Sequence, residues 1–144
     1  MPPEPPVALV VARRFDARPE TVFDAWLDPD TARKFLFTAP GGVIVRIEIE
    51  PRIGGRFLIV DRRADQDIEH VGAYLDIDRP QRLMFSFAVP AFSEQSTNVT
   101  VDIAQDEAGS ALTLTHEGVL PEWVEQTRAG WTMILEGLAK ALQA

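Results

Sequence analysis

The sequence predicts an α+β domain: a curved antiparallel sheet of six or seven strands wrapped round a long C-terminal helix, with an internal cavity. Three observations lead to this prediction. Apolar and polar residues alternate with a period of two through most of residues 43–116, which is typical of half-buried strands. The longest helical pattern covers residues 120–142, at the end of the chain. Two short helical segments follow the first predicted strand.

Length and composition indicate one globular domain. We expect residues 1–6 to form a flexible proline-rich tail and residues 7–144 to form a single domain, because 144 residues suffice for one sizeable core. The net charge of −8 argues against nucleic acid and anionic membrane surfaces as partners, since both favour clustered Lys and Arg. Residues 1–6 have neither the basic region nor the apolar run of a signal peptide, so we expect none, and the sequence has no apolar run of membrane-spanning length. A cytoplasmic protein is therefore expected.

Metal and cysteine chemistry find no support in the sequence. The chain has no cysteine, which excludes disulfides, thiolate metal sites and cysteine nucleophiles. The two histidines, His70 and His116, stand far apart without the spacing of metal ligands. We expect no metal and no cofactor.

The first predicted elements are a strand and two short helices. Residues 7–15 are apolar and β-branched enough for the strand. Pro19 opens the first helix, because proline suits the first helical position. The predicted buried side of this helix consists of Val22, Phe23, Trp26 and Leu27. Asp28 is a good N-cap for a second helix that runs from Pro29 to about Phe35.

Six further strands are predicted, with short connections that favour antiparallel pairing. Their ranges are residues 43–50, 56–62, 70–77, 83–89, 97–103 and 112–116. In the third of these, Val71 and Leu75 belong to the apolar side. His70 then falls on the polar side, and we expect it at the surface. Alternation also places Glu48 and Arg56 on the solvated outer face.

The C-terminal helix is predicted from about Pro121 to Ala141. Proline at the first helical position and the spacing of the apolar residues both favour it. The apolar stripe comprises Leu120, Val124, Thr127, Trp131, Ile134, Leu135, Leu138 and Leu142. Trp131 stands in the middle of this stripe, so we expect it to be buried where the helix meets the sheet.

Several segments resemble one known family. They are residues 18–26 (RPETVFDAW), 52–57 (RIGGRF), 70–75 (HVGAYL), 80–85 (PQRLMF), 112–118 (LTLTHEG) and the helix from Gly130 to Leu138. Together they resemble the family named for activators of the ninety-kilodalton heat-shock-protein ATPase, within the START-like, or SRPBCC, superfamily. The resemblance implies a helix-grip fold. The family tends to carry a tryptophan pair after the second helix, where this chain has Phe35-Leu36-Phe37.

A cavity is also expected on physical grounds, because a strongly curved sheet cannot press against a helix along its whole length. The gap should open beneath the two short helices. The residues expected to line it are Phe35, Phe37, Ile47, Phe57, Ile59, Val71, Phe85, Phe87, Val99, Leu114, His116, Trp131 and Leu135. Such a lining is mostly apolar with one polar group, as small-molecule sites usually are. The alternative for each aromatic residue is ordinary core packing.

Two ionisable residues are candidates for chemistry inside this cavity. His116 is on the apolar side of its strand, where it can act as a hydrogen-bonding group or a general base. The alternative is a histidine satisfied by backbone or water. Asp61 shares the side of Phe57 and Ile59 and could stand at the cavity mouth, but an exposed strand-end aspartate is the stronger expectation.

Three functions remain open from the sequence. We predict non-catalytic binding of a small, largely apolar molecule, such as a lipid, with His116 orienting it. The second hypothesis is an enzyme of cyclase or aromatase type that uses His116 and Asp61. The third, which the resemblance implies, is activation of a chaperone ATPase by protein contact, with a role in the stress response.

Overall fold

The described part of the chain consists of seven strands, two short helices and one long helix. The computed structural model describes residues 7–37, 42–91 and 96–142, so the predicted tail at residues 1–6 lies outside the described residues. In chain order the elements are β1 (Val7–Phe15), α1 (Pro19–Ala25), α2 (Pro29–Ala32), β2 (Val43–Ile49), β3 (Arg56–Arg63), β4 (Gln66–Asp78), β5 (Arg82–Phe87), β6 (Thr97–Asp106), β7 (Gly109–Val119), a 3₁₀ turn (Pro121–Trp123) and α3 (Val124–Leu142).

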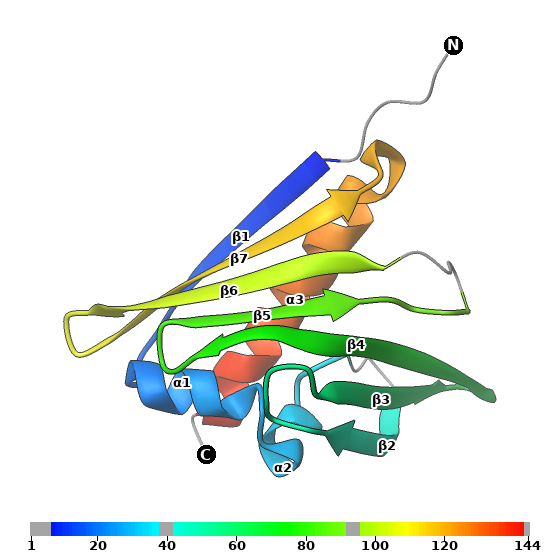
Figure 1. Cartoon of the computed structure of the whole chain (residues 1–144), viewed down its shortest axis with the longest axis horizontal. Helices are drawn as coiled ribbons and strands as arrows, with labels where there is room; N and C mark the ends of the chain where they lie inside the picture. The colour runs from blue at the N-terminus through cyan, green and yellow to red at the C-terminus, as the bar shows by residue number, and fades with distance from the viewer. Residues whose placement is uncertain (1–6, 38–41, 92–95, 143–144) are drawn as a thin grey trace.

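The strands form a single sheet in the order β1-β7-β6-β5-β4-β3-β2, and all neighbouring strands are antiparallel. The sheet wraps round α3, and α1 and α2 lie beside the C-terminal end of that helix (Figure 1). The predicted fold class is confirmed: the helix-grip arrangement has its two short helices directly after β1.

Helix α3 is fixed to the sheet by an apolar stripe and by polar contacts with β1. Its buried residues are Trp131, Leu135 and Leu138. Trp131 is 3% exposed, as the sequence predicts. Arg13 on β1 donates two hydrogen bonds to the carboxylate of Glu136, at 2.8 and 3.2 Å. Both partners are partly solvated, so this pair positions the helix more than it stabilises the fold.

The alternation predicted for the central strands agrees with the structure. The buried residues of β5, β6 and β7 include Leu83, Phe85, Val99, Val101, Ile103, Leu112 and Leu114. Glu48 and Arg56 are exposed, also as expected. These strands therefore present one continuous apolar face toward α3.

The structure of β4 shows that the prediction for His70 is wrong. The sequence pattern places His70 at the surface, but it is buried, as is Tyr74, whereas Val71 is half-buried on the opposite side of the strand. The register between β4 and β5 shifts between Tyr74 and Asp76. This irregularity reverses the alternation, so Ile77 packs against the core although it shares the sequence parity of Val71.

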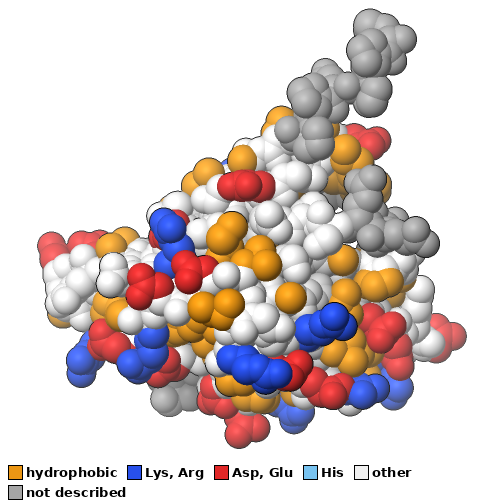
Figure 2. All heavy atoms as spheres, viewed as in Figure 1, with side chains coloured by type: hydrophobic (Ala, Val, Ile, Leu, Met, Phe, Trp, Pro, Cys, Tyr) orange, Lys and Arg blue, Asp and Glu red, His pale blue; other side chains and the backbone are white. Residues whose placement is uncertain are grey.

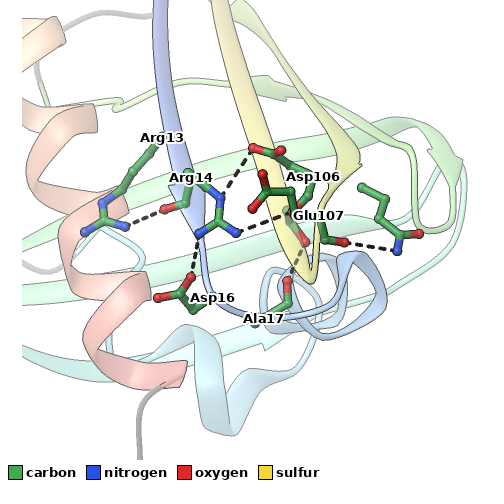
Figure 3. A network of polar contacts seen from close by, with 8 residues as sticks. Arg13, Arg14, Asp16, Ala17, Asp106 and Glu107 are labelled. Atoms are coloured by element: carbon green, nitrogen blue, oxygen red, sulfur yellow. Dashed lines mark hydrogen bonds and ion pairs between the residues drawn. The ribbon is translucent and has the colours of Figure 1, made fainter.

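The hairpin between β6 and β7 is tied to the end of β1. Arg14 pairs with Asp16 at 2.5 Å and with Asp106 at 3.4 Å (Figure 3). The hydroxyl of Ser110, which is fully buried, donates to the carbonyl oxygen of Ala17 at 2.5 Å. These contacts hold this end of the sheet against the segment that leads into α1.

The surface seen in Figure 2 mixes acidic, basic and apolar side chains without a large field of one sign. Among the described helices, none has the length and apolar character needed to cross a membrane.

Candidate ligand-binding site

Most of the predicted cavity residues meet in one cluster between the sheet and α3. Phe35, Phe37, Phe57, Ile59, Phe85, Val99, Leu114, His116, Trp131 and Leu135 are all buried there. Ile47 and Phe87 are partly buried and pack against the same cluster. Val71 is the exception, because the alternation of β4 turns it to the other face of the sheet. The cluster is rich in aromatic rings and contains both histidines of the chain.

His116, on β7, has hydrogen-bond partners for both ring nitrogens. The indole N–H of Trp131 donates to Nδ1 of His116 at 3.0 Å. Nε2 of His116 lies 2.7 Å from Oγ1 of Thr97, and that hydroxyl donates to the carbonyl oxygen of Phe87 at 3.2 Å. An indole nitrogen can only donate, so Nδ1 must accept and the proton of the neutral ring is on Nε2. Each donor in this series of hydrogen bonds, from Trp131 through His116 and Thr97 to Phe87, therefore meets an acceptor.

This hydrogen-bond chain bears on the chemistry open to His116. Burial lowers its pKa to about 4, so the ring is neutral near pH 7. A second ring proton would have to be placed on Nδ1, opposite the N–H of Trp131. Within the described structure, neither nitrogen has a lone pair or proton left for a ligand. His116 therefore acts as a fixed internal link between α3, β6 and β7.

His70, on β4, is buried to a similar degree, but within the described ranges only one of its ring nitrogens has a hydrogen-bond partner. Its Nδ1 lies 3.2 Å from the carbonyl oxygen of Ile59 on β3. A carbonyl only accepts, so the proton of the neutral ring is on Nδ1. No described residue forms a hydrogen bond with Nε2, which keeps a lone pair. Burial lowers the pKa of His70 to about 4, against the opposing effects of the backbone of Ile59 and Ile68 and of the charge of Asp61.

Two phenylalanine rings lie parallel to the ring of this histidine. The ring of Phe37 is 4.7 Å from that of His70 and 4.9 Å from that of Phe87, with interplanar angles of 3° and 2°. The ring centroids of His70 and Phe87 are 6.1 Å apart. In a column with Phe37 in the middle, the two outer rings would be much farther from each other. Phe37 therefore lies flat across two rings that stand side by side. We call these three rings the aromatic stack.

Trp131 and Phe57 border the aromatic stack. The ring of Trp131 meets Phe37 and Phe87 edge-on, at 5.9 and 6.1 Å. Phe57 stacks on Phe37 at 6.1 Å. A Cβ atom at Gly72 would lie 2.6 Å from the ring of Phe57 and 1.8 Å from the carbonyl oxygen of Ser86, so only glycine fits between them. The missing side chain at this position leaves room for the aromatic rings.

The backbone of Phe37 is strained. Its φ angle is 60°, a left-handed conformation that a bulky side chain rarely adopts. Such a conformation costs on the order of 1–3 kcal/mol and persists where surrounding contacts hold it. Here the contacts of the ring with His70 and Phe87 are what hold it.

Two further polar side chains are buried at the edges of the cluster. Asp61, expected to be exposed, is fully buried and accepts a hydrogen bond at 2.6 Å from Arg63. Asp61 lies two residues after the buried Ile59 on β3, so alternation keeps it on the inner side. Trp26 packs edge-on against Phe35 at 5.4 Å, and its buried indole N–H has no hydrogen-bond partner among the described residues.

The outer face of the sheet carries a depression of about 360 Å³ over β4–β7. Its lining includes three aspartates, Asp76, Asp78 and Asp102, and Arg82, which pairs with Asp102 at 2.9 Å. The depression is open to solvent, and its charged lining does not suit an apolar ligand. The interior aromatic cluster is therefore the better candidate site.

The seven-stranded antiparallel sheet closed on one long helix defines a START-like helix-grip domain. The chain belongs to the family described as "Activator of Hsp90 ATPase homolog 1-like protein", whose family model matches residues 16–143. This membership supports a ligand-binding or activator-like domain. No curated protein matches the sequence.

Solved structures share the fold over nearly the full length of the chain. Protein CV1439 from Chromobacterium violaceum superposes with a TM-score of 0.86 at 25% identity, over 95% of this chain and 97% of that one. A protein of unknown function from Staphylococcus aureus, SA2116, gives 0.85 at 16% identity, over 96% and 94%. The AHSA1-like protein from Aeromonas hydrophila gives 0.81 at 21% identity, over 94% and 92%.

Proposed function

We propose that the protein binds a small, largely apolar molecule between the sheet and α3, without converting it chemically. The observation that carries this proposal is the hydrogen bonding of the two buried histidines. Both nitrogens of His116 are already bonded inside the protein, which argues against an acid–base role. His70 offers one lone pair in aromatic surroundings. Such surroundings suit a ligand that is apolar apart from one hydrogen-bond donor.

The group that hydrogen-bonds to the ligand is then His70 rather than His116. The donor belongs to a substituent at the edge of the ligand, which reaches past the rim of the imidazole ring to the in-plane lone pair of Nε2 of His70. Because this is one neutral hydrogen bond, its loss in His70→Phe weakens binding by about 0.5–1.5 kcal/mol, or several-fold. Shape and apolar contact provide most of the affinity.

Methyl NMR tests the location of binding. The fluorescent apolar amine N-phenyl-1-naphthylamine serves as the probe, with the Leu and Val methyl groups labelled. We expect shift changes at the buried residues Val99, Leu114 and Leu135, and none at the exposed Val10 and Val45. Changes confined to exposed methyl groups would contradict the proposal. Mass spectrometry of the probe after incubation should recover it unchanged, and a converted probe would favour the cyclase or aromatase-type alternative.

Activation of a chaperone ATPase by protein contact is the second candidate, supported by the matching family description. It makes a different prediction in the same NMR experiment. Adding a heat-shock chaperone of this class in place of the probe would perturb surface residues, such as the exposed Trp123 near the start of α3. A response to the chaperone with no interior response to the probe would favour this function.

A further inference from the structure

The aromatic stack indicates what kind of ligand the interior accepts, and this inference rests on the proposed function. The rings of His70 and Phe87 stand side by side and parallel, with an interplanar angle of 5°. Two neighbouring strands thus present a flat π surface wider than one ring. In the structure, the ring of Phe37 covers this surface.

Phe37 differs from the other rings of the cluster in how it is held. His70 and Phe87 are on the strands β4 and β5, whereas Phe37 follows the turns after α2 and has a positive φ angle. Movement of Phe37 away from the stack relieves its backbone strain. Moving its ring out of the stack therefore costs less free energy than moving the ring of an unstrained residue would. Phe37 is therefore the ring that a ligand displaces most readily.

The edge-on contacts of Trp131 add a second restriction on shape. Its ring meets both Phe37 and Phe87 at 63°, so it forms a wall beside the stacking surface. Hydrogen bonding to His116 fixes the orientation of this wall. A flat molecule lying on His70 and Phe87 keeps the edge-to-face contact with Trp131 that Phe37 makes. A puckered ring of the same size loses both the parallel and the edge-to-face contacts.

We propose that Phe37 is an internal plug, and that the ligand is a flat aromatic molecule that takes the place of its ring across His70 and Phe87. The stacking position is occupied either by Phe37 or by the ligand, never by both. Removal of the Phe37 ring should therefore strengthen binding, although it deletes a residue of the site itself. Ordinary lining residues have the opposite effect when truncated.

Two probes with the same skeleton test the preference for flatness. 2-Naphthol is flat and aromatic, and 2-decalol is its saturated, puckered counterpart with the same hydroxyl group. Calorimetry on the full chain should give about two- to twelvefold tighter binding of 2-naphthol, the usual gain from aromatic pairing beyond buried area. Equal binding of the two, or tighter binding of 2-decalol, would overturn the inference.

Phe37→Ala tests the plug. We expect 2-naphthol to bind on the order of tenfold more tightly to this variant, because it no longer competes with a ring for the same position. 2-Decalol should gain less, since the stacking surface favours flat rings. The matched control is Phe35→Ala, which deletes a buried ring that packs on Trp26 outside the aromatic stack. Weaker or unchanged 2-naphthol binding to folded Phe37→Ala would contradict the plug.

The wild-type protein provides a test that needs no variant. In the free protein, NOEs should connect the ring protons of Phe37 with those of His70 and Phe87. Saturation with 2-naphthol should replace them by NOEs from the probe to Phe87. Retention of the Phe37 contacts at saturation would overturn the inference. If N-phenyl-1-naphthylamine still perturbs Val99 and Leu114 in that case, the proposed binding function stands and only the plug fails.

Discussion

The two buried histidines of this protein stand on the same face of one sheet but are bonded differently. His116 is linked through Trp131 and Thr97 into a chain in which every donor has an acceptor. Among the described residues, His70 forms a hydrogen bond at Nδ1 alone, and its ring stacks beneath the strained residue Phe37. Burial lowers the pKa of both to about 4, so neither burial nor pKa distinguishes them. The hydrogen-bonding capacity that remains distinguishes them, and it supports our proposal that a ligand binds in the His70 region.

The largest expected effect is on the dependence of stability on pH. The unfolded chain protonates each histidine near pH 6.5, whereas the folded chain does so near 4. The unfolded state therefore binds more protons between these values, and stability falls as the pH drops from about 6.5 to 4. We expect a loss of about 3 kcal/mol for each histidine, measured by urea unfolding across this range.

Substitution of each histidine shows how much of this pH-dependent loss of stability comes from His70 and how much from His116. Asp61 and Arg63 act on His70 in opposite senses, whereas burial alone accounts for the shift of His116. His70→Phe and His116→Phe should each remove about half of the pH-dependent loss. A stability profile that is flat between pH 6.5 and 4 in the wild-type protein would contradict the burial of neutral histidines.

Trp131→Ala is expected to have the next largest effect. The side chain packs against both regions, so its removal creates a cavity and leaves Nδ1 of His116 without a donor. The expected loss is about 3–5 kcal/mol in the free energy of urea unfolding. Trp131→Phe, which keeps most of the volume, should lose less. A loss below about 1 kcal/mol for Trp131→Ala would place the side chain outside the core.

Thr97→Val separates the hydrogen-bond chain of His116 from simple packing. The substitution keeps the shape but removes the hydroxyl that accepts from Nε2 of His116 and donates to Phe87. An unpaired buried N–H costs about 1–3 kcal/mol. The control Thr113→Val, at an exposed position on the outer face of β7, should change stability little. Equal losses of stability in the two variants would argue that the hydrogen bonds of Thr97 do not contribute to stability.

His70→Phe is expected to have the smallest effect on stability. It removes the donor to the Ile59 carbonyl but keeps a flat ring beneath Phe37. The expected loss is about 0.5–1.5 kcal/mol at pH 7. His116→Phe should cost more, because it leaves the indole N–H of Trp131 without an acceptor and removes the bond between Nε2 and the Thr97 hydroxyl. A larger loss of stability for His70→Phe than for His116→Phe would contradict the difference in hydrogen bonding between the two histidines.

The sequence was sufficient for the fold because its periodicities are strong. The stripe of α3 and the alternation of β5, β6 and β7 place most of the core correctly. The prediction for His70 was wrong because the reversal between Tyr74 and Asp76 leaves no mark in the residue pattern. A register anchored on Ile68 and Tyr74, both buried, would have placed His70 inside.

The remaining features of the site depend on three-dimensional contacts. The burial of Asp61 agrees with the side that it shares with Phe57 and Ile59, but its hydrogen bond from Arg63 could not be read from the sequence. The positive φ angle of Phe37 follows no glycine or asparagine signal in the sequence. The hydrogen bond between Trp131 and His116 joins residues fifteen positions apart on a helix and a strand, a pairing that spacing alone does not predict.

Long-range ¹H–¹⁵N NMR of the imidazole rings reports directly which nitrogen of each histidine carries the proton. At pH 7 we expect two neutral rings with opposite tautomers. His116 should be protonated at Nε2, between Trp131 and Thr97, and His70 at Nδ1, facing Ile59. Two rings with the same tautomer, or a positively charged ring at either position, would contradict the account.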